Sequence, residues 1–344
     1  MVEKIGAEAF LMLSENLRVI DVRSPAEFVQ GHIPGAKNLP LFNNEERAVV
    51  GTLYKNSGRE TSVLKGLDFI GPKMSGFVKQ ANKIAPKRKV LMHCWRGGMR
   101  SESMAWLLST AGFHVQLLED GYKSYRKFIR EKLGTASNYI ILSGKTGSGK
   151  TEVLLQMKSM GMQVIDLEGL ANHKGSAFGA LGEDPQPTNE QFENDLYKDW
   201  AGLNHTQTIF LEDESRSIGK VVLPEVFFQV MRISPVIRLE MGEELRVKRL
   251  VVDYCKYPKE QLIESVNKIE KRIGGQHAKK IIEAIEAEDF YTAIAMVLGY
   301  YDKSYNYGLT KRENPKIHYL ETDTLDAEKN AESVIQFYTG LGRI

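Results

Sequence analysis

The sequence predicts an α/β protein of two domains, and three observations lead to this. Short apolar segments with strand character alternate with segments of helical periodicity in both halves of the chain. Two strand candidates run directly into glycine-rich turns that open a helix, within 88–110 and 138–161. At 344 residues the chain is long for one compact unit. The stretch 132–138 consists mainly of small and polar residues, which is typical of a domain boundary. We therefore expect domains at 1–134 and 135–344.

In the first half, residues 17–22 and 88–94 read as strands because they are short, apolar and bounded by polar residues. A helix follows the second strand, with Met104, Leu107 and Leu108 at helical spacing. Residues 113–121 are expected to form the next strand. This order predicts a parallel sheet in the first domain.

The second half opens with a strand, a glycine-rich turn and a helix within 138–161. Further strands are expected within 162–169, 208–215, 234–242 and 316–323, and helices within 243–257, 258–298 and 326–341. This is an α/β pattern with additional helices toward the C-terminus.

The composition is that of an ordinary globular protein, with 42% hydrophobic and 26% charged residues. The formal net charge of +2, from 46 basic and 44 acidic side chains, neither requires nor excludes a nucleic-acid partner. Two cysteines, Cys94 and Cys255, form neither a disulfide framework nor a zinc site. The N-terminal residues lack a signal-peptide pattern, and no apolar run approaches the length of a membrane span. We therefore expect a cytoplasmic protein.

The stretch "HCWRGGMRS", residues 93–101, indicates a reactive thiol in an anion-binding loop. A thiolate near neutral pH needs positive surroundings, which glycine-rich backbone, arginines and a helix N-terminus supply. We predict Cys94 as the catalytic nucleophile. The predicted anion-binding residues are those that follow it, Arg96, Gly97, Gly98, Met99 and Arg100.

Residues 21–40, "DVRSPAEFVQGHIPGAKNLP", resemble the signature of the rhodanese superfamily, and the resemblance extends over 5–133. It implies a rhodanese-like fold in which Asp21, Arg23 and His32 support the structure. The spacing from Cys94 to Arg100 is C-x5-R, whereas single-domain rhodaneses usually have C-x4-R, and the longer form also resembles cysteine phosphatases. The loop alone leaves chalcogen transfer and phosphatase chemistry open.

The stretch "GKTGSGKT" fits the P-loop pattern, with a strand before it and a helix after it. Its backbone is expected to hold a di- or triphosphate, Lys150 to reach the terminal phosphate oxygens, and Thr151 to act as a ligand for Mg²⁺. Such a site also needs an acid at the end of another strand. Glu212, Asp213, Asp166 and Glu168 are candidates, and we assign Asp213. The predicted phosphate-binding residues are Gly144, Lys145, Thr146, Gly147, Ser148, Gly149, Lys150 and Thr151.

The two loops together, with the segment 166–194, resemble the bacterial tRNA 2-selenouridine synthase family over essentially the whole chain. The resemblance implies that selenium from selenophosphate replaces the sulfur of wobble 2-thiouridine in tRNA, with S-geranylation by geranyl diphosphate. It implies no tightly bound cofactor. It also implies an enzyme that supplies selenophosphate as a partner, and substrate contact by His173 and Ser176. Whether the P-loop binds geranyl diphosphate or a nucleotide stays open.

Basic residues that could hold tRNA phosphates lie in the C-terminal helical segments, interleaved with glutamates. They are Arg246, Lys248, Arg249, Lys256, Lys259, Lys268, Lys271, Arg272, Lys279 and Lys280. Aromatic residues that could stack on a base follow at Tyr300, Tyr301, Tyr305 and Tyr307. An ordinary solvated helix explains the basic residues equally well.

Two other enzyme classes and one non-enzymatic function remain alternatives. The enzymes are a rhodanese-fold cysteine phosphatase and a plain sulfurtransferase, each fused to a P-loop kinase-like domain. The third is a nucleotide-gated adaptor carrying an inactive rhodanese fold. The intact Cys94 and Lys150 argue against the adaptor.

Overall fold

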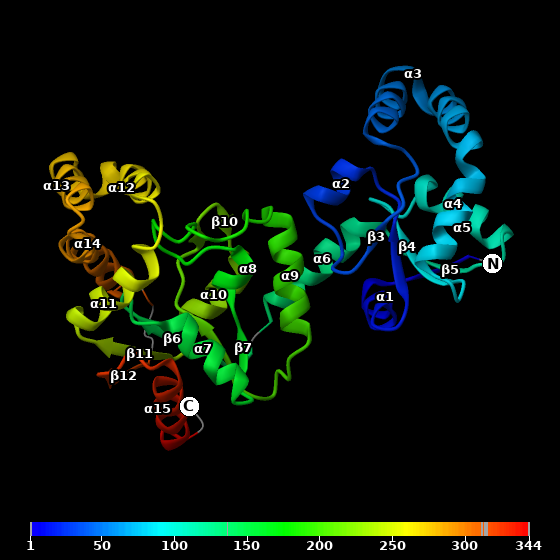
Figure 1. Ribbon diagram of the computed structural model, residues 1–344. Coiled ribbons are helices and arrows are strands. Elements are labelled where there is room, and N and C mark those ends of the chain that lie inside the picture. The colour runs from blue at the N-terminus through cyan, green and yellow to red at the C-terminus, as the bar shows by residue number, and fades with distance from the viewer. Residues whose placement is uncertain (1, 136, 311, 313–315, 343–344) are drawn as a thin grey trace. The chain divides into compact units, whose positions relative to one another are not determined.

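Two five-stranded parallel sheets and one two-stranded antiparallel ribbon organise the residues that the computed structural model describes, 2–135, 137–310, 312 and 316–342 (Figure 1). These residues divide into two units. The first comprises Met1–Lys132 and Glu193–Asp195, and the second Leu133–Phe192 and Leu196–Ile344. Both units have the α/β architecture that the sequence predicts.

The sheet of the first unit has the strand order β1-β5-β4-β2-β3, with every pair parallel. The three predicted strands are confirmed as β2, β4 and β5. The strands are β1 (Glu3–Ile5), β2 (Arg18–Asp21), β3 (Lys37–Asn38), β4 (Lys89–His93) and β5 (His114–Leu118). The strand β4 lies at the centre, so its end carries Cys94 into the middle of the sheet edge.

Helices of the first unit are α1 (Ala7–Ser14), α2 (Pro25–Gln30), α3 (Asn44–Ile70), α4 (Met74–Ile84), α5 (Met99–Thr110) and α6 (Gly121–Leu133). Both α2 and α3 begin with a capping box, formed by Ser24 with Glu27 and by Asn43 with Glu46. The helix α3, which the sequence does not predict, bends at Gly58, where φ is +84° (Figure 1).

The sheet of the second unit has the strand order β12-β11-β6-β8-β7, again with every pair parallel. All five predicted strands are confirmed as β6 (Tyr139–Gly144), β7 (Gln163–Ile165), β8 (Ile209–Glu212), β11 (Val236–Met241) and β12 (Ile317–Thr322). Every residue of β6 is buried, which suits a central parallel strand covered on both faces. The ribbon pairs β9 (Ser217–Ile218) with β10 (Val221–Val222).

Helices pack around this second sheet and form a separate apolar cluster beyond it. They are α7 (Lys150–Ser159), α8 (Leu167–Ala171), α9 (Asn189–Ala201), α10 (Glu225–Ile233), α11 (Glu243–Tyr254), α12 (Lys259–Ile273), α13 (Gly275–Glu286), α14 (Phe290–Thr310) and α15 (Ala327–Gly340). The cluster joins α11–α14, which are the additional helices expected from the sequence. None of the described helices combines the length and apolar character needed to cross a membrane.

Candidate active site

The Cys94 loop connects the end of β4 to the start of α5, so the thiol lies at the N-terminus of a helix of 12 residues. Cys94 is buried, and Ser101 Oγ lies 3.2 Å from its Sγ atom. The Sγ atom is also 3.9 Å from the carbonyl oxygen of Gly98. Ser101 Oγ also lies 3.0 Å from Gly98 O, so the thiol, this hydroxyl and this carbonyl form one polar cluster at the first turn of α5.

Two glycines hold this loop against the start of α6. Gly97 and Gly121 have φ of +64° and +61°, and a Cβ on Gly121 would lie 2.5 Å from both Cys94 O and Gly97 N. The backbone N–H of Tyr122 donates to Cys94 O at 2.8 Å, and that of Lys123 to Trp95 O at 3.0 Å. The conformation of the loop is therefore fixed by a close backbone approach that leaves no space for a side chain.

The arginines of the loop have different surroundings. Arg96 is exposed, whereas Arg100 donates from Nη1 and Nη2 to the Glu27 carboxylate at 2.7 and 3.2 Å. Burial alone would raise the pKa of Glu27, but the hydrogen bonds and charge of Arg100 hold that pKa below its usual range. Glu27 thus stays ionised and fixes the guanidinium at the first turn of α5. The remaining predicted anion-site residue, Met99, has an exposed side chain.

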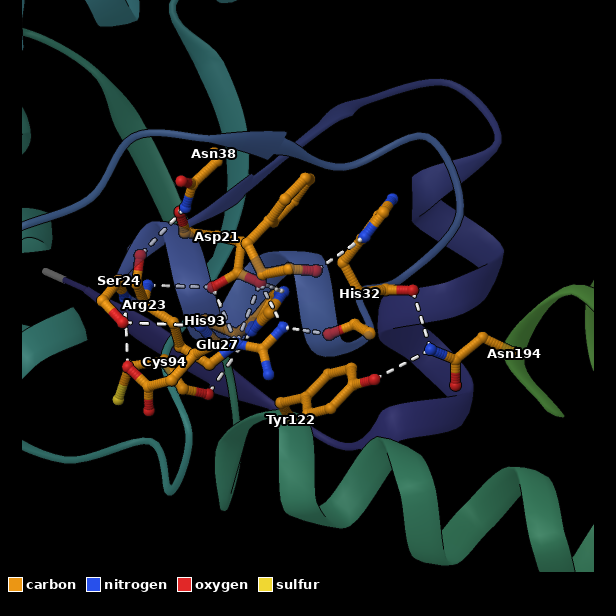
Figure 2. A network of polar contacts seen from close by, with 12 residues as sticks. Asp21, Arg23, Ser24, Glu27, His32, Asn38, His93, Cys94, Tyr122 and Asn194 are labelled. Atoms are coloured by element: carbon orange, nitrogen blue, oxygen red, sulfur yellow. Dashed lines mark hydrogen bonds and ion pairs between the residues drawn. The ribbon is translucent and has the colours of Figure 1, made fainter. Parts of the chain in front are cut away.

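A buried polar network lies beside the Cys94 loop (Figure 2). Asp21 and Arg23 are fully buried, and Arg23 donates from Nε and Nη2 to the Asp21 carboxylate. His93 is also fully buried, with Nε2 3.8 Å from Asp21 Oδ2. Burial lowers the pKa of His93 despite the opposing charge of Asp21, so this imidazole is neutral at neutral pH. These residues support the structure, as the resemblance implies for Asp21 and Arg23.

The P-loop occupies the turn between β6 and α7, in the context that the sequence predicts. Gly147 and Gly149 have φ of +84° and +77°, which turns the loop backbone into the helix. Lys150 Nζ donates to Gly144 O at 3.2 Å, so the lysine lies across the loop that it is expected to serve. Ser148 is fully buried, and its Oγ has no hydrogen-bond partner among the described residues.

Two helices far along the chain hold the first half of the P-loop. Arg246 of α11 donates to Thr146 O at 3.2 Å and forms a salt bridge with Asp302 of α14. Lys145 Nζ is 3.6 Å from the same Asp302 carboxylate. Arg246 is buried, so its prediction as a surface residue for RNA phosphates is wrong. Its guanidinium binds Thr146 O and Asp302 and so stabilises the loop.

Two carboxylates converge beside the second half of the P-loop. Thr151 Oγ1 donates to Glu168, and a Cβ on Gly175 would lie 2.7 Å from Glu168 Oε1 and 2.9 Å from both Glu214 oxygens. Burial and then the charge of Glu168 raise the pKa of Glu214 to about 8, against the opposing charge of Lys150. The sequence offers Glu168 as one candidate acid and gives no signal for Glu214. A position at the end of a strand does not tell which acid approaches Thr151.

Asp213, the acid that we predict for the P-loop site, lies in a different hydrogen-bond network. Its carboxylate accepts from Ser143 Oγ at 2.7 Å and from Arg312, and Tyr305 OH is 3.3 Å away. Tyr305 OH also accepts from the backbone N–H of Gly144 at 2.8 Å. Asp213 and Tyr305 therefore lie at the first residues of the P-loop, and Asp213 does not contact Thr151.

The two other predicted contact residues lie on the segment after β7. His173 is half-buried, and burial lowers its pKa despite the charge of Glu183. Ser176 is buried, with its Oγ 3.2 Å from Tyr254 OH. Among the described residues no group of three or more histidine, cysteine or acidic side chains forms a metal centre. Hard oxygen ligands at Thr151 and Glu168 nevertheless fit Mg²⁺, which keeps several waters or phosphate oxygens as ligands.

Comparison with known proteins decides the family. Residues 137–329 match the model of the tRNA 2-selenouridine synthase AAA domain, and residues 7–128 match the rhodanese-like domain. A tRNA 2-selenouridine synthase from Marinobacter nauticus is 34% identical over 86% of this chain and 89% of its own length. The chain belongs to the tRNA 2-selenouridine synthase family. The resemblance drawn from the two loops is thereby confirmed.

Other relatives in the tRNA 2-selenouridine synthase family give the same result. The protein of that name from Shewanella denitrificans is 35% identical over 86% of this chain and 89% of its own length. The one from Bdellovibrio bacteriovorus is 43% identical over 71% of this chain and 66% of its own length. The Cys94 loop lies inside the rhodanese-like match and the P-loop inside the AAA-domain match, so both loops belong to the shared parts.

Proposed function

We propose that this chain replaces the sulfur of 2-thiouridine at the tRNA wobble position with selenium from selenophosphate. The observation that carries the proposal is that one member of this family has two glycine-rich loops at helix N-termini with different reactive side chains. One loop presents the Cys94 thiol at a helix N-terminus, and the other presents Lys150 in a P-loop.

In this proposal the P-loop binds geranyl diphosphate. Its backbone N–H groups and Lys150 hold the diphosphate and stabilise the charge that develops as the bond between C1 and oxygen breaks. The sulfur of 2-thiouridine forms the new bond to C1, and the base loses its N3 proton. Thr151 and Glu168 would hold Mg²⁺, which supplies positive charge for the departing diphosphate.

The Cys94 loop serves the second reaction. Selenophosphate binds to the loop amides with Arg96 and Arg100, and its selenium attacks C2 of the geranylated base. The bond from C2 to sulfur breaks, and the geranylated thiol leaves with the proton of selenophosphate. We assign Cys94 to act on the selenium donor. Its sulfur attacks the phosphorus atom, the bond from selenium to phosphorus breaks and leaves selenium on C2, and water then cleaves the bond from sulfur to phosphorus to release phosphate. An enzyme that makes selenophosphate is the partner that this reaction requires.

The test is mass analysis of wobble nucleosides after incubation of the protein with 2-thiouridine tRNA, selenophosphate and geranyl diphosphate. We expect S-geranyl-2-thiouridine and 2-selenouridine as products. Folded protein that changes the mass of no nucleoside would disprove the proposal. Release of phosphate from an aryl phosphate would favour the phosphatase instead, and transfer of sulfur from thiosulfate to cyanide the plain sulfurtransferase.

A further inference from the structure

A pocket of about 280 Å³ lies between α3 and the first turn of α5, within the first unit. The proposed reactions use one residue of its lining, Arg100, and give the rest of the pocket no role. Its lining combines aromatic, aliphatic and cationic side chains, contributed by Phe42, Arg47, Val50, Gly51, Tyr54 and Arg100. The volume is just below the range of about 300–1,000 Å³ for small-molecule pockets, which fits one flat ring system better than an extended ligand.

The pocket is next to the Cys94 loop. Arg100 lines it, and the neighbouring residue Ser101 has its Oγ 3.2 Å from Cys94 Sγ. Farther along α3, Arg59 Nη2 is 3.9 Å from Met99 Sδ, so this helix passes over the first turn of α5. A ligand in the pocket would therefore lie at the same helix N-terminus as the thiol.

The side chains of the pocket suit a base with its phosphate. Tyr54 lines the pocket although its side chain is 60% exposed, so one face of its ring is available for stacking. Arg47 and Arg100 both contact Glu27, with Arg47 Nε 3.7 Å from Glu27 Oε2, which leaves a net positive charge on this side. Aromatic rings with arginines are how proteins hold unstacked RNA bases and their phosphates. Arg47 Nε is buried and has no hydrogen-bond partner among the described residues, and a purely apolar chain would offer it no acceptor.

We propose that this pocket receives an unstacked RNA base, the wobble uridine derivative, and presents it to the Cys94 loop. Tyr54 stacks on the base, and Arg47 binds the adjacent phosphate. The inference rests on the proposed function because it takes RNA as the substrate, and it adds the place where the base is bound.

The test uses an anticodon stem–loop RNA with the fluorescent pyrimidine pyrrolocytosine at the wobble position. Stacking on Tyr54 is expected to quench its fluorescence in the wild type and in Tyr54→Phe, and not in Tyr54→Ala. With the 2-thiouridine stem–loop and saturating selenophosphate and geranyl diphosphate, Tyr54→Ala should raise the KM for RNA about ten-fold in formation of 2-selenouridine, and Tyr54→Phe should restore it. Arg47→Ala should weaken RNA binding more at low salt than at high salt.

Tyr291→Ala is the matched control, since Tyr291 is 47% exposed on α14 and lies outside the pocket. It should bind and react as the wild type does. Thermal unfolding of each variant checks that it is folded, and the exposed position of Tyr54 predicts little change. Quenching that survives in Tyr54→Ala, or a wild type that does not bind the stem–loop, would overturn the inference. Wild-type protein that binds the stem–loop with quenching but makes no 2-selenouridine would overturn the proposed function instead.

Discussion

The Cys94 loop and the P-loop have the same local construction and different chemistry. Each follows a strand of a parallel sheet, turns on glycines with positive φ, and ends at the N-terminus of a helix. Such a construction presents backbone N–H groups and the positive end of a helix, which favour an anion. The first loop adds a thiol, Cys94, whereas the second adds a cation, Lys150, and acids near Thr151. Under the proposed function the shared backbone geometry therefore determines the charge of the ligand, and the different side chains determine the reaction.

The strongest test of this division is Cys94→Ser. A serine keeps the size of the side chain but is a much weaker nucleophile, so we expect formation of 2-selenouridine to fall by roughly 10³-fold or more. Geranyl transfer should stay within about two-fold, because it uses the other loop. Nucleoside mass analysis measures both products in one reaction. Selenation that stays within about ten-fold of the wild type would show that the thiol is not the reacting group.

Lys150→Ala tests the second loop. The lysine supplies charge to the departing diphosphate, so its loss should slow geranyl transfer by about 10²-fold. Reaction of an RNA that already carries S-geranyl-2-thiouridine should be unaffected. Lys158→Ala, an exposed lysine at the end of the same helix, is the control. If Lys150→Ala abolished ATP binding and left geranyl transfer intact, the loop would serve a nucleotide.

The two loops should also differ in their tolerance of a methyl group. In Gly121→Ala the new Cβ meets backbone at Cys94 and Gly97, so we expect a loss of about 2 kcal/mol in the free energy of unfolding. In Gly149→Ala it meets the Arg249 guanidinium, which can move, so the loss should be about 1 kcal/mol. Urea denaturation measures both.

Gly76→Ala is the control for these two variants, because its Cβ would enter open space inside α4. It should be neutral or slightly stabilising. Equal losses in Gly121→Ala and Gly149→Ala would mean that only the positive φ matters and that the close approach at Cys94 carries no additional cost.

The smallest expected effect concerns Glu214 and pH. Its pKa is raised to about 8 in the folded protein, so the folded state holds a proton that the unfolded state has lost between about pH 4.5 and pH 8. Stability should therefore fall as the pH rises through this window. Glu214→Gln carries no such proton. Between pH 5 and pH 9 its free energy of unfolding should fall by about 1 kcal/mol less than that of the wild type, a value that allows for the partial exposure of the side chain.

Glu264→Gln, an exposed glutamate on α12, is the control for the pH series and should follow the wild type. The measurement is the melting temperature as a function of pH. A Glu214→Gln curve parallel to that of the wild type would mean that the carboxylate is ionised across the whole window.

The sequence predicts the parts of the fold that depend on local pattern. Strand, glycine turn and helix follow one another within a short stretch at both loops, so 93–101 and 144–151 could be located directly. The bent helix α3 was not predicted, because its interior positions are mostly exposed and carry little apolar periodicity.

Contacts between side chains that are distant in the sequence could not be predicted. Nothing in a linear pattern indicates that Glu27 pairs with Arg100, or that Glu168 and not Asp213 approaches Thr151. Such contacts depend on how strands and helices pack, and one carboxylate at a strand end looks like another in the sequence. Arg246 is another example. It is buried, although in the sequence of α11 it stands among charged and apolar residues just as its exposed neighbours do.

The hold of α14 on the P-loop has a consequence for synthesis of the chain. Tyr305 accepts the hydrogen bond of Gly144, 161 residues earlier, and Asp302 fixes Arg246 and through it Thr146. Chains emerge from the ribosome N-terminus first and fold as their segments become available. The P-loop is therefore translated before the residues of α14 that contact it. A nascent chain that ends before α14 lacks the groups that hold this loop in place.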